Sequence, residues 1–220
     1  MIGGIEMSKE KIVVDFYVLC YKLKNTIRTG WKDWNVKRDR LESVAEHIYG
    51  AQMIALGMYS EYDYEINIWK VILMLAIHEL EETIIGDLTQ FQISREEKEK
   101  MGHAAIHGIL QDLLMGATIE RIIMEFDERK TPEALFAYQC DKIECDIMSK
   151  IYDEEGDVDL SHQEGNETME NHEVKELLES GDRFSTMWLK FGQKKYHYDE
   201  NFTAVSNYVM NNRILKNNAQ

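Results

Sequence analysis

The scarcity of proline and the helical spacing of apolar residues most restrict what this chain can fold into. Pro132 is the one proline among 220 residues. A proline inside a helix breaks or kinks it because proline lacks a backbone N–H donor, so a chain with one proline can form long helices. Apolar residues recur three and four positions apart, as on one helical face, and no segment alternates like a half-buried strand. The sequence predicts an all-α fold, a compact single-domain helical bundle, with helices near 12–26, 43–59, 67–85, 94–115, 118–126, 131–152, 174–191 and 201–215.

The chain is predicted to form one domain over residues 1–220, a length that suits a single core. Within it, the helical pattern fails over about 153–172, and this acidic segment is predicted to be a mobile surface loop. Cys20, Cys140 and Cys145 are too few and too irregularly spaced for a disulfide framework or a thiolate zinc site. Because neither a secretory signal nor a membrane-spanning apolar run is evident, we expect a cytoplasmic protein without a membrane partner.

The net charge of −15 argues against a nucleic-acid polymer as a partner, since proteins that bind one collect Lys and Arg to neutralise phosphates. Between residues 28 and 40 the balance reverses, and the cations there are Arg28, Lys32, Lys37, Arg38 and Arg40, against Asp33 and Asp39. This segment is either a solvated loop or a lip that receives a small anionic substrate. We favour the lip, because the segment leads directly into a candidate metal ligand.

Two histidines that lie beside acids carry the strongest functional signal in the chain. Glu46 and His47 begin the second predicted helix, where Ser43 and Glu46 have the spacing of a capping box, and residues 78–82 read His-Glu-Leu-Glu-Glu. Asp141, on a mostly apolar helical face, is a candidate further ligand. Mixed imidazole and carboxylate ligands suit divalent manganese, cobalt, iron or zinc. Such an ion activates water and stabilises charge on a phosphoryl oxygen, so the pattern predicts a metal-dependent hydrolase.

Each of these residues also has an ordinary structural interpretation. A lone histidine such as His47 at a helix start is more often a cap or a surface residue. His78 follows an apolar run, and a buried imidazole beside carboxylates needs partners because unpaired buried charge is costly. Glu82 lies one turn after His78 on the same face, whereas Glu81 is predicted to point away into solvent. The pattern as a whole, rather than any one residue, supports a metal site.

His103 and His107 form a second pair with the spacing of one helical turn. Such a pair can bind a metal ion, because both side chains lie on the same face of a helix. No matching acids lie nearby in the sequence, however. We therefore interpret both histidines as structural.

Ordered motifs in this chain resemble those of the HD-domain hydrolases, in particular the branch that contains the 5′-deoxynucleotidases. The motifs are Arg28-Thr29-Gly30-Trp31, Glu42-Ser43-Val44-Ala45-Glu46-His47, His78-Glu79-x-x-Glu82-x-x-x-Gly86-Asp87, and Asp141. The resemblance covers about residues 14–151, and the ordered set is specific, as a single His-Glu pair would not be. It implies an HD-type helical bundle, often a homodimer, with one divalent metal ion at its centre. Such enzymes remove phosphate from deoxyribonucleoside 5′-monophosphates.

The resemblance implies four metal ligands, His47, His78, Glu79 and Asp141. The family has aspartate where this chain has Glu79, and the extra methylene is large against a metal–oxygen distance of about 2.0–2.2 Å. Glu79 therefore either bends back to ligate the ion, shifts the metal preference or loses the ion. Manganese, cobalt, iron and zinc are the expected ions, and magnesium is less favoured.

The resemblance also implies roles on the substrate side of the site. Glu82 matches the carboxylate assigned to catalysis, and it would move a proton between water and the leaving oxygen. Asp87 matches an acid that lines the sugar and phosphate side. Trp31 matches the tryptophan of the nucleotide pocket. Arg28 is the arginine expected to contact the phosphate. Arg38 is held as a second candidate, because the segment after Trp31 is slightly longer than in the relatives and the match of its arginines to theirs is not fixed.

Three functions are therefore open on the sequence alone. The first is a phosphohydrolase of (deoxy)nucleoside 5′-monophosphates, which makes a small nucleotide the expected partner. The second is a phosphohydrolase of nucleoside triphosphates or of a signalling nucleotide, which product analysis would separate. The third is a nucleotide-binding protein without catalysis, in which Glu79 has weakened the metal. We favour the first, since a site that only binds does not require Glu82.

Overall fold

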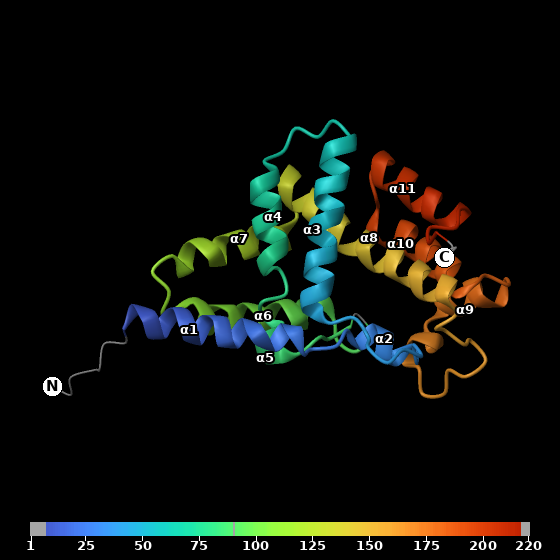
Figure 1. The fold of residues 1–220 in the computed structure, drawn as a ribbon, viewed down its shortest axis with the longest axis horizontal. Helices are drawn as coiled ribbons and strands as arrows, with labels where there is room; N and C mark the ends of the chain where they lie inside the picture. The colour runs from blue at the N-terminus through green and yellow to red at the C-terminus, as the bar shows by residue number, and fades with distance from the viewer. Residues whose placement is uncertain (1–7, 90, 217–220) are drawn as a thin grey trace.

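The computed structural model describes residues 8–89 and 91–216 and confirms the all-α prediction (Figure 1). Within these residues, β pairing is limited to one isolated bridge between Ile27 and Ser43, and no helix is both long and apolar enough to cross a membrane. The elements are α1 (Lys9–Cys20), η1 (Tyr21–Lys24), α2 (Thr29–Asp33), α3 (Val44–Glu61), α4 (Ile68–Ile77), α5 (Glu82–Ile85), α6 (Arg95–Leu110), α7 (Gly116–Glu128), α8 (Pro132–Glu155), η2 (Glu167–Glu170), α9 (His172–Glu179), α10 (Phe184–Tyr196) and α11 (Glu200–Asn211).

The 24-residue helix α8 runs through the middle of the molecule, behind α3 in Figure 1. It contacts α3, α4, α7, α10 and α11. Thr131 caps its start by accepting from the N–H of Ala134 at 3.3 Å, and Pro132 occupies the first turn. Gly156 ends it at a φ of +78°, a left-handed value that glycine adopts without strain. Because helices pack around α8, its acids can face the interior.

Two hydrophobic cores hold α8 in place. The larger joins it to α3, α4 and α11, and its buried members include Ala51, Ala55, Val71, Met74, Leu75, Phe136, Ala137, Ile143 and Phe202. The second is aromatic, joins α2 to α8 and α10, and includes Trp31, Trp34, Tyr152, Phe184 and Phe191. Full burial of one large apolar side chain contributes about 1.5–3 kcal/mol, so both cores fix the positions of the helices that carry the predicted ligands.

The C-terminal pair of helices predicted over 174–191 and 201–215 is three helices, α9, α10 and α11. The chain turns between α9 and α10 at Gly181, whose φ of +91° lies in the left-handed region that other residues adopt at a cost. This turn lets α10 pack along α8. The prediction missed it because the apolar spacing on either side is continuous.

The acidic segment predicted as a surface loop over 153–172 is only partly a loop. Helix α8 extends three residues into it, and η2 forms within it. Asn166 is buried and accepts from the N–H of Thr168 at 3.0 Å. Gln163 donates to the carbonyl of Trp34 at 2.9 Å, which ties the segment to the end of α2.

Candidate metal centre

His47 lies in the first turn of α3 and is fully buried. The predicted capping box is present, since Ser43 accepts from the N–H of Glu46 and donates its own N–H to the Glu46 carboxylate at 2.9 Å. This cap fixes where α3 begins. Nδ1 of His47 lies 2.6 Å from Oε2 of Glu144 on α8 and donates to that carboxylate. Nε2 therefore faces the interior, 3.1 Å from Oδ1 of Asp141.

The helix predicted over 67–85 is wrong as one continuous element, because it breaks at His78. Helix α4 ends one residue before His78, and α5 begins four residues after it. A regular helix rotates neighbouring side chains apart by about 100°, whereas this turn directs His78 and Glu79 to one point. Nδ1 of His78 donates to the carbonyl of Leu75 at 2.8 Å, which leaves Nε2 with the free lone pair.

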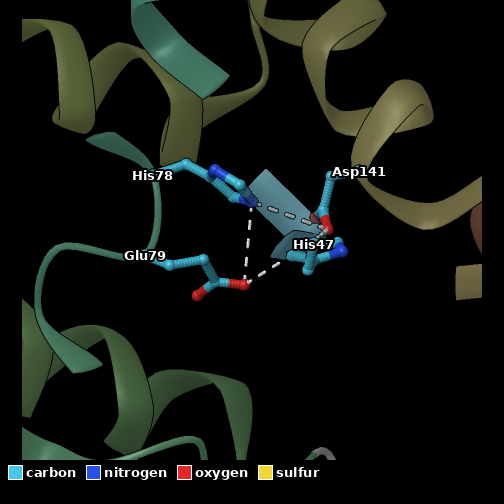
Figure 2. A group of neighbouring side chains, drawn as sticks. All are labelled: His47, His78, Glu79 and Asp141. Atoms are coloured by element: carbon cyan, nitrogen blue, oxygen red, sulfur yellow. Dashed lines mark hydrogen bonds and ion pairs between the residues drawn. The ribbon is translucent and has the colours of Figure 1, made fainter. Parts of the chain in front are cut away.

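Four side chains from three parts of the chain meet at this point, as Figure 2 shows: His47, His78, Glu79 and Asp141. One ligand atom from each lies within 4.8 Å of the others. Oε1 of Glu79 is 3.9 Å from Nε2 of His47 and 3.6 Å from Nε2 of His78. Oδ1 of Asp141 is 3.7 Å from the same atom of His78. The structure thus brings together all four predicted ligands.

The cluster fits a divalent metal ion. Nε2 of His78 is buried and has no hydrogen-bond partner among the described residues, a costly state for a polar atom. Two imidazole nitrogens and two carboxylate oxygens form a donor set that borderline divalent ions accept. Although burial disfavours their charge, nearby lysines and histidines hold the pKa of Glu79 and of Asp141 well below the ordinary values. Both carboxyls are therefore ionised, as metal binding requires.

Glu82 lies beside this cluster, at the start of α5, and is 2% exposed. Lys98 on α6 donates to its Oε1 at 3.0 Å. Its other oxygen, Oε2, is buried and has no hydrogen-bond partner within residues 8–89 and 91–216. Burial, followed by repulsion from Glu79, raises the pKa of Glu82 well above the ordinary value, and Lys98 opposes that rise.

Glu81 does not point into solvent, which corrects the prediction made from a continuous helix. The turn carries it toward α6, where a Cβ added to Gly102 would lie 3.2 Å from its Cγ. Its Oε2 is buried. Burial and repulsion from Glu79 raise the pKa of Glu81 to about 8. Glu79, Glu81 and Glu82 thus all lie in the field of one cation, Lys98.

Arg28 and Asp87 line a cavity of about 590 Å³ that also contains part of the cluster. Nη1 of Arg28 lies 3.4 Å from Oε1 of Glu79 and 3.5 Å from Oδ1 of Asp87. The carboxylate of Asp87 also accepts from the backbone N–H of Thr29, and its carbonyl accepts from the Thr29 hydroxyl at 2.7 Å. The start of α2 is thereby attached to the segment that follows α5, with the guanidinium held against the cluster.

Trp31 also lines the cavity, but as a buried part of its wall, 3% exposed. Its Nε1 donates to Oε2 of Glu42 at 2.7 Å, and its ring packs edge-on against Tyr152 and Trp188. Burial and repulsion from Glu144 raise the pKa of Glu42 to about 7. A substrate that reaches Trp31 would meet a ring already fixed in place.

The structure does not bring Arg38 to the cavity. Asn35, with a φ of +49°, turns the chain after α2, and Arg38 then pairs with Glu155 and with Asp157, the latter at 3.1 Å. Arg28 is therefore the arginine of the two that lies against the cluster. Of these two arginines of the predicted anion-receiving lip, Arg28 lines the cavity and Arg38 does not.

His103 and His107 have separate partners. Nε2 of His103 lies 2.8 Å from Oδ2 of Asp127, whereas Nδ1 of His107 lies 3.4 Å from Oε1 of Glu120. Within the described part of the chain, neither histidine belongs to a group that could hold a metal ion.

A family model for the HD domain matches residues 20–180. The chain belongs to the HD-domain family. Among its curated relatives, the 5′-deoxynucleotidase hdd1 of Schizosaccharomyces pombe is 32% identical over 165 residues, which cover 70% of this chain and 80% of the relative. The 5′-deoxynucleotidase HDDC2 of Dictyostelium discoideum is 32% identical over 150 residues, which cover 64% of this chain and 78% of the relative.

Solved structures share this HD-domain architecture. A conserved hypothetical protein from Pyrococcus furiosus aligns with a TM-score of 0.57 at 26% identity, over 76% of this chain and 97% of that protein. A predicted metal-dependent phosphohydrolase from Magnetospirillum magnetotacticum aligns with a TM-score of 0.60 at 20% identity, over 94% of this chain and 93% of that protein. The latter similarity supports the fold alone. Helices α10 and α11 lie beyond residue 180, where the matched HD-domain segment ends.

Residues that the sequence interpretation missed complete the surroundings of the HD-domain cluster. Glu144 orients His47, and Nζ of Lys142 lies 2.7 Å from Oδ2 of Asp141. Glu144 lies three positions after Asp141 on α8, and this spacing on one helical face could have identified it. Lys98 gave no such signal, because it comes from a separate helix.

Proposed function

We propose that this HD-domain chain is a metal-dependent phosphohydrolase that removes phosphate from deoxyribonucleoside 5′-monophosphates. The observation that carries the proposal is the meeting of His47, His78, Glu79 and Asp141 at one buried point beside the further carboxylate of Glu82. The 5′-deoxynucleotidase relatives support the substrate class. A homodimer and a cytoplasmic location stay predictions from the sequence.

The donor set favours manganese, cobalt, iron or zinc over magnesium, which prefers oxygen ligands. A divalent ion bound there supplies Lewis acidity to a phosphoryl oxygen and lowers the pKa of water. Arg28 is positioned to stabilise negative charge on the phosphate with charge-assisted hydrogen bonds. Oε2 of Glu82 can accept the proton of the attacking water and return it to the leaving 5′ oxygen. Lys98 holds the other oxygen of that carboxylate.

The sugar and base would extend along the wall formed by Trp31 and Asp87. Asp87 offers carboxylate oxygens, which accept hydrogen bonds from sugar hydroxyls. Trp31 offers an apolar ring whose N–H is already used by Glu42. These two contacts position the phosphate ester rather than take part in its cleavage.

The experiment that tests the function is phosphate release from a panel of deoxyribonucleoside and ribonucleoside 5′-monophosphates and the corresponding triphosphates. The protein is first treated with a chelator, and manganese, cobalt, zinc or magnesium is then restored. We expect release from deoxyribonucleoside monophosphates that requires an added metal and is absent in Glu82→Ala. Absence of release with every metal, together with an empty site by elemental analysis, would favour a nucleotide-binding protein instead. Release from triphosphates alone would favour the other class of phosphohydrolase.

A further inference from the structure

One part of the cavity wall carries cations and aromatic rings that the proposed reaction does not use. Arg129 follows the last residue of α7, Lys142 lies on α8, and Lys195 lies near the end of α10. Tyr138 and Tyr196 line the same wall. In a chain with a net charge of −15, cations from separate helices that line one cavity indicate an anionic ligand.

The backbone of Arg129 is strained. It adopts a left-handed conformation, with a φ of +51°, where α7 ends. Glycine or asparagine is usual at this position, and another L-residue is disfavoured there by roughly 1–2 kcal/mol. Strained residues of this kind concentrate at functional sites, where the local conformation serves a ligand. Arg129 is therefore a candidate for a role beyond the end of a helix.

The side chain of Arg129 is stacked and available to a ligand. Its Cζ lies 3.8 Å from the centroid of the Tyr138 ring. Nε is buried and lacks a hydrogen-bond partner among the described residues. Asp127 interacts electrostatically with the guanidinium, but its ion pair is with His103. A stacked guanidinium keeps its N–H edge free, and that edge binds two phosphate oxygens at once. An anion at this edge would use donors that the protein itself leaves without partners.

Lys142 connects this wall to the metal centre. Its Nζ lies 2.7 Å from Oδ2 of Asp141, and 5.5 Å and 5.9 Å from the ring centroids of Tyr138 and Tyr196. The two tyrosine rings meet edge to face, with their centroids 6.2 Å apart. The wall therefore begins one ion pair away from a metal ligand, so that an anion held there would lie beside the phosphate of a bound substrate.

Two further acids that line the cavity, Asp127 and Glu99, have partners of their own. Asp127 is paired with His103, and Glu99 with Arg95. These pairs reduce the repulsion that an incoming phosphate would otherwise meet. The cations of the wall therefore face two acids whose charge is already partly balanced.

We propose that Arg129, Lys142 and Lys195 form a second anion subsite, which takes a phosphate group beside the metal centre. The proposal rests on the proposed function only in the choice of phosphate as the anion. Lys195 belongs to α10, beyond the end of the matched HD-domain segment at residue 180. Lys195 is therefore the member of the subsite that the family match does not include, whereas Arg129 and Lys142 lie within it.

The test is a calorimetric titration of the manganese-loaded protein with inorganic phosphate. We expect two phosphate groups per chain in the natural protein and one in Arg129→Gly. Glycine suits the left-handed conformation, so this variant should unfold at the same temperature as the natural protein or higher. Arg121→Gln removes a cation from an exposed position of the same helix, outside the cavity, and should keep both phosphates.

Nucleotide titrations distinguish the two sources of a second phosphate, with Glu82→Ala as the background to prevent turnover. Preferential binding of a nucleoside 3′,5′-bisphosphate or 5′-diphosphate over the 5′-monophosphate by about tenfold, abolished by Arg129→Gly, would assign the subsite to a second phosphate of the nucleotide. A second binding event with inorganic phosphate alone would assign it to the released product. Both results support the subsite.

Other outcomes overturn it. A single phosphate per chain in both the natural protein and Arg129→Gly would do so, as would an equal loss in Arg121→Gln. Lys195→Gln, at an exposed position, repeats the test if Arg129→Gly fails to fold, and retention of both phosphates by that variant would then overturn the subsite as proposed. Absence of metal-dependent hydrolysis with the second phosphate retained would overturn the proposed function and leave the subsite standing.

Discussion

Oε2 of Glu144 lies 2.6 Å from Nδ1 of His47, so a carboxylate on α8 fixes the ring and the tautomer of a metal-ligand candidate on α3. The two helices approach closely here: a Cβ added to Gly50 on α3 would lie 2.5 Å from Oε1 of Glu144 on α8. Partners of this kind hold a ligating imidazole in its productive orientation. The pair therefore links the packing of two helices to the geometry of the metal centre.

Glu144→Ala is expected to weaken metal binding by about 10–100-fold, because His47 loses the partner that orients it. The measurement is a titration of the chelator-treated protein with manganese or zinc. Gly50→Ala should change the affinity in the same direction, since its methyl group would displace Glu144 without removing it. Unchanged metal affinity in Glu144→Ala would show that the packing around His47 suffices to orient the ring.

Lys98→Met is expected to lower kcat by about 100-fold, the lower end of what a positioned acid or base contributes, with little change in metal content. Without the lysine, Glu82 loses the nearer of the two cations that favour its ionised form, and Arg28 alone opposes the effect of burial. A smaller share of the carboxylate can then accept a proton from water. Steady-state kinetics and elemental analysis check this prediction. Lys98→Arg should recover part of kcat, and a rise in KM at constant kcat would instead assign Lys98 to substrate binding.

The parts of the fold that could be predicted are those that depend on short-range sequence patterns, such as helix caps. The capping box at Ser43 and the cap and proline at Thr131 and Pro132 set two helix starts where they were expected. The turn at residues 78–81 could not be predicted, because the apolar spacing around it is that of an unbroken helix. Tertiary packing overrides the local preference there, and it does so at residues that meet at the candidate metal centre.

The candidate site was predictable for residues that belong to ordered motifs and not for their supporting partners. His47 and His78 lie in such motifs, whereas Lys98 lies on a separate helix with nothing local to mark it. Arg38 was placed on the substrate side because distance along the chain was taken for distance in space. The turn at Asn35 carries Arg38 away from the cavity, although Arg38 is close to Trp31 in the sequence.

Glu79→Asp is expected to weaken metal binding by about tenfold. Oε1 of Glu79 lies 3.6 Å and 3.9 Å from the Nε2 atoms of His78 and His47, so the longer side chain reaches the cluster, and aspartate would withdraw the oxygen by about 1.5 Å. Competition with a chromogenic chelator measures the affinity. Glu79→Gln keeps the length and removes the charge, which separates reach from charge. Equal or tighter binding by Glu79→Asp would mean that the surrounding turn adjusts to the shorter acid.

A last prediction concerns Asp146, a fully buried acid on α8 outside the metal centre. Tyr198 donates to its Oδ2 at 2.9 Å, and Oδ1 has no hydrogen-bond partner in the part of the chain that the structure describes. Helix α10 packs so closely that a Cβ added to Gly192 would lie 2.2 Å from Oδ2. Burial raises the pKa of Asp146 well above the ordinary value, so folding favours the neutral acid.

Because the folded pKa is raised, the contribution of Asp146 to stability is fully present below the unfolded pKa of about 3.9 and is lost as pH rises through the folded pKa. Asparagine does not ionise, so Asp146→Asn would not lose stability in this way as pH rises. Asparagine also has the same size as aspartate, so the variant should fit against α10. Relative to the natural protein, its free energy of unfolding should increase from pH 4 to pH 7 by on the order of 2 kcal/mol. Urea unfolding at several pH values measures this difference. Asp63→Asn, at an exposed position, should show no such trend, and a difference for Asp146→Asn that is independent of pH would mean that the acid is already ionised in the folded protein.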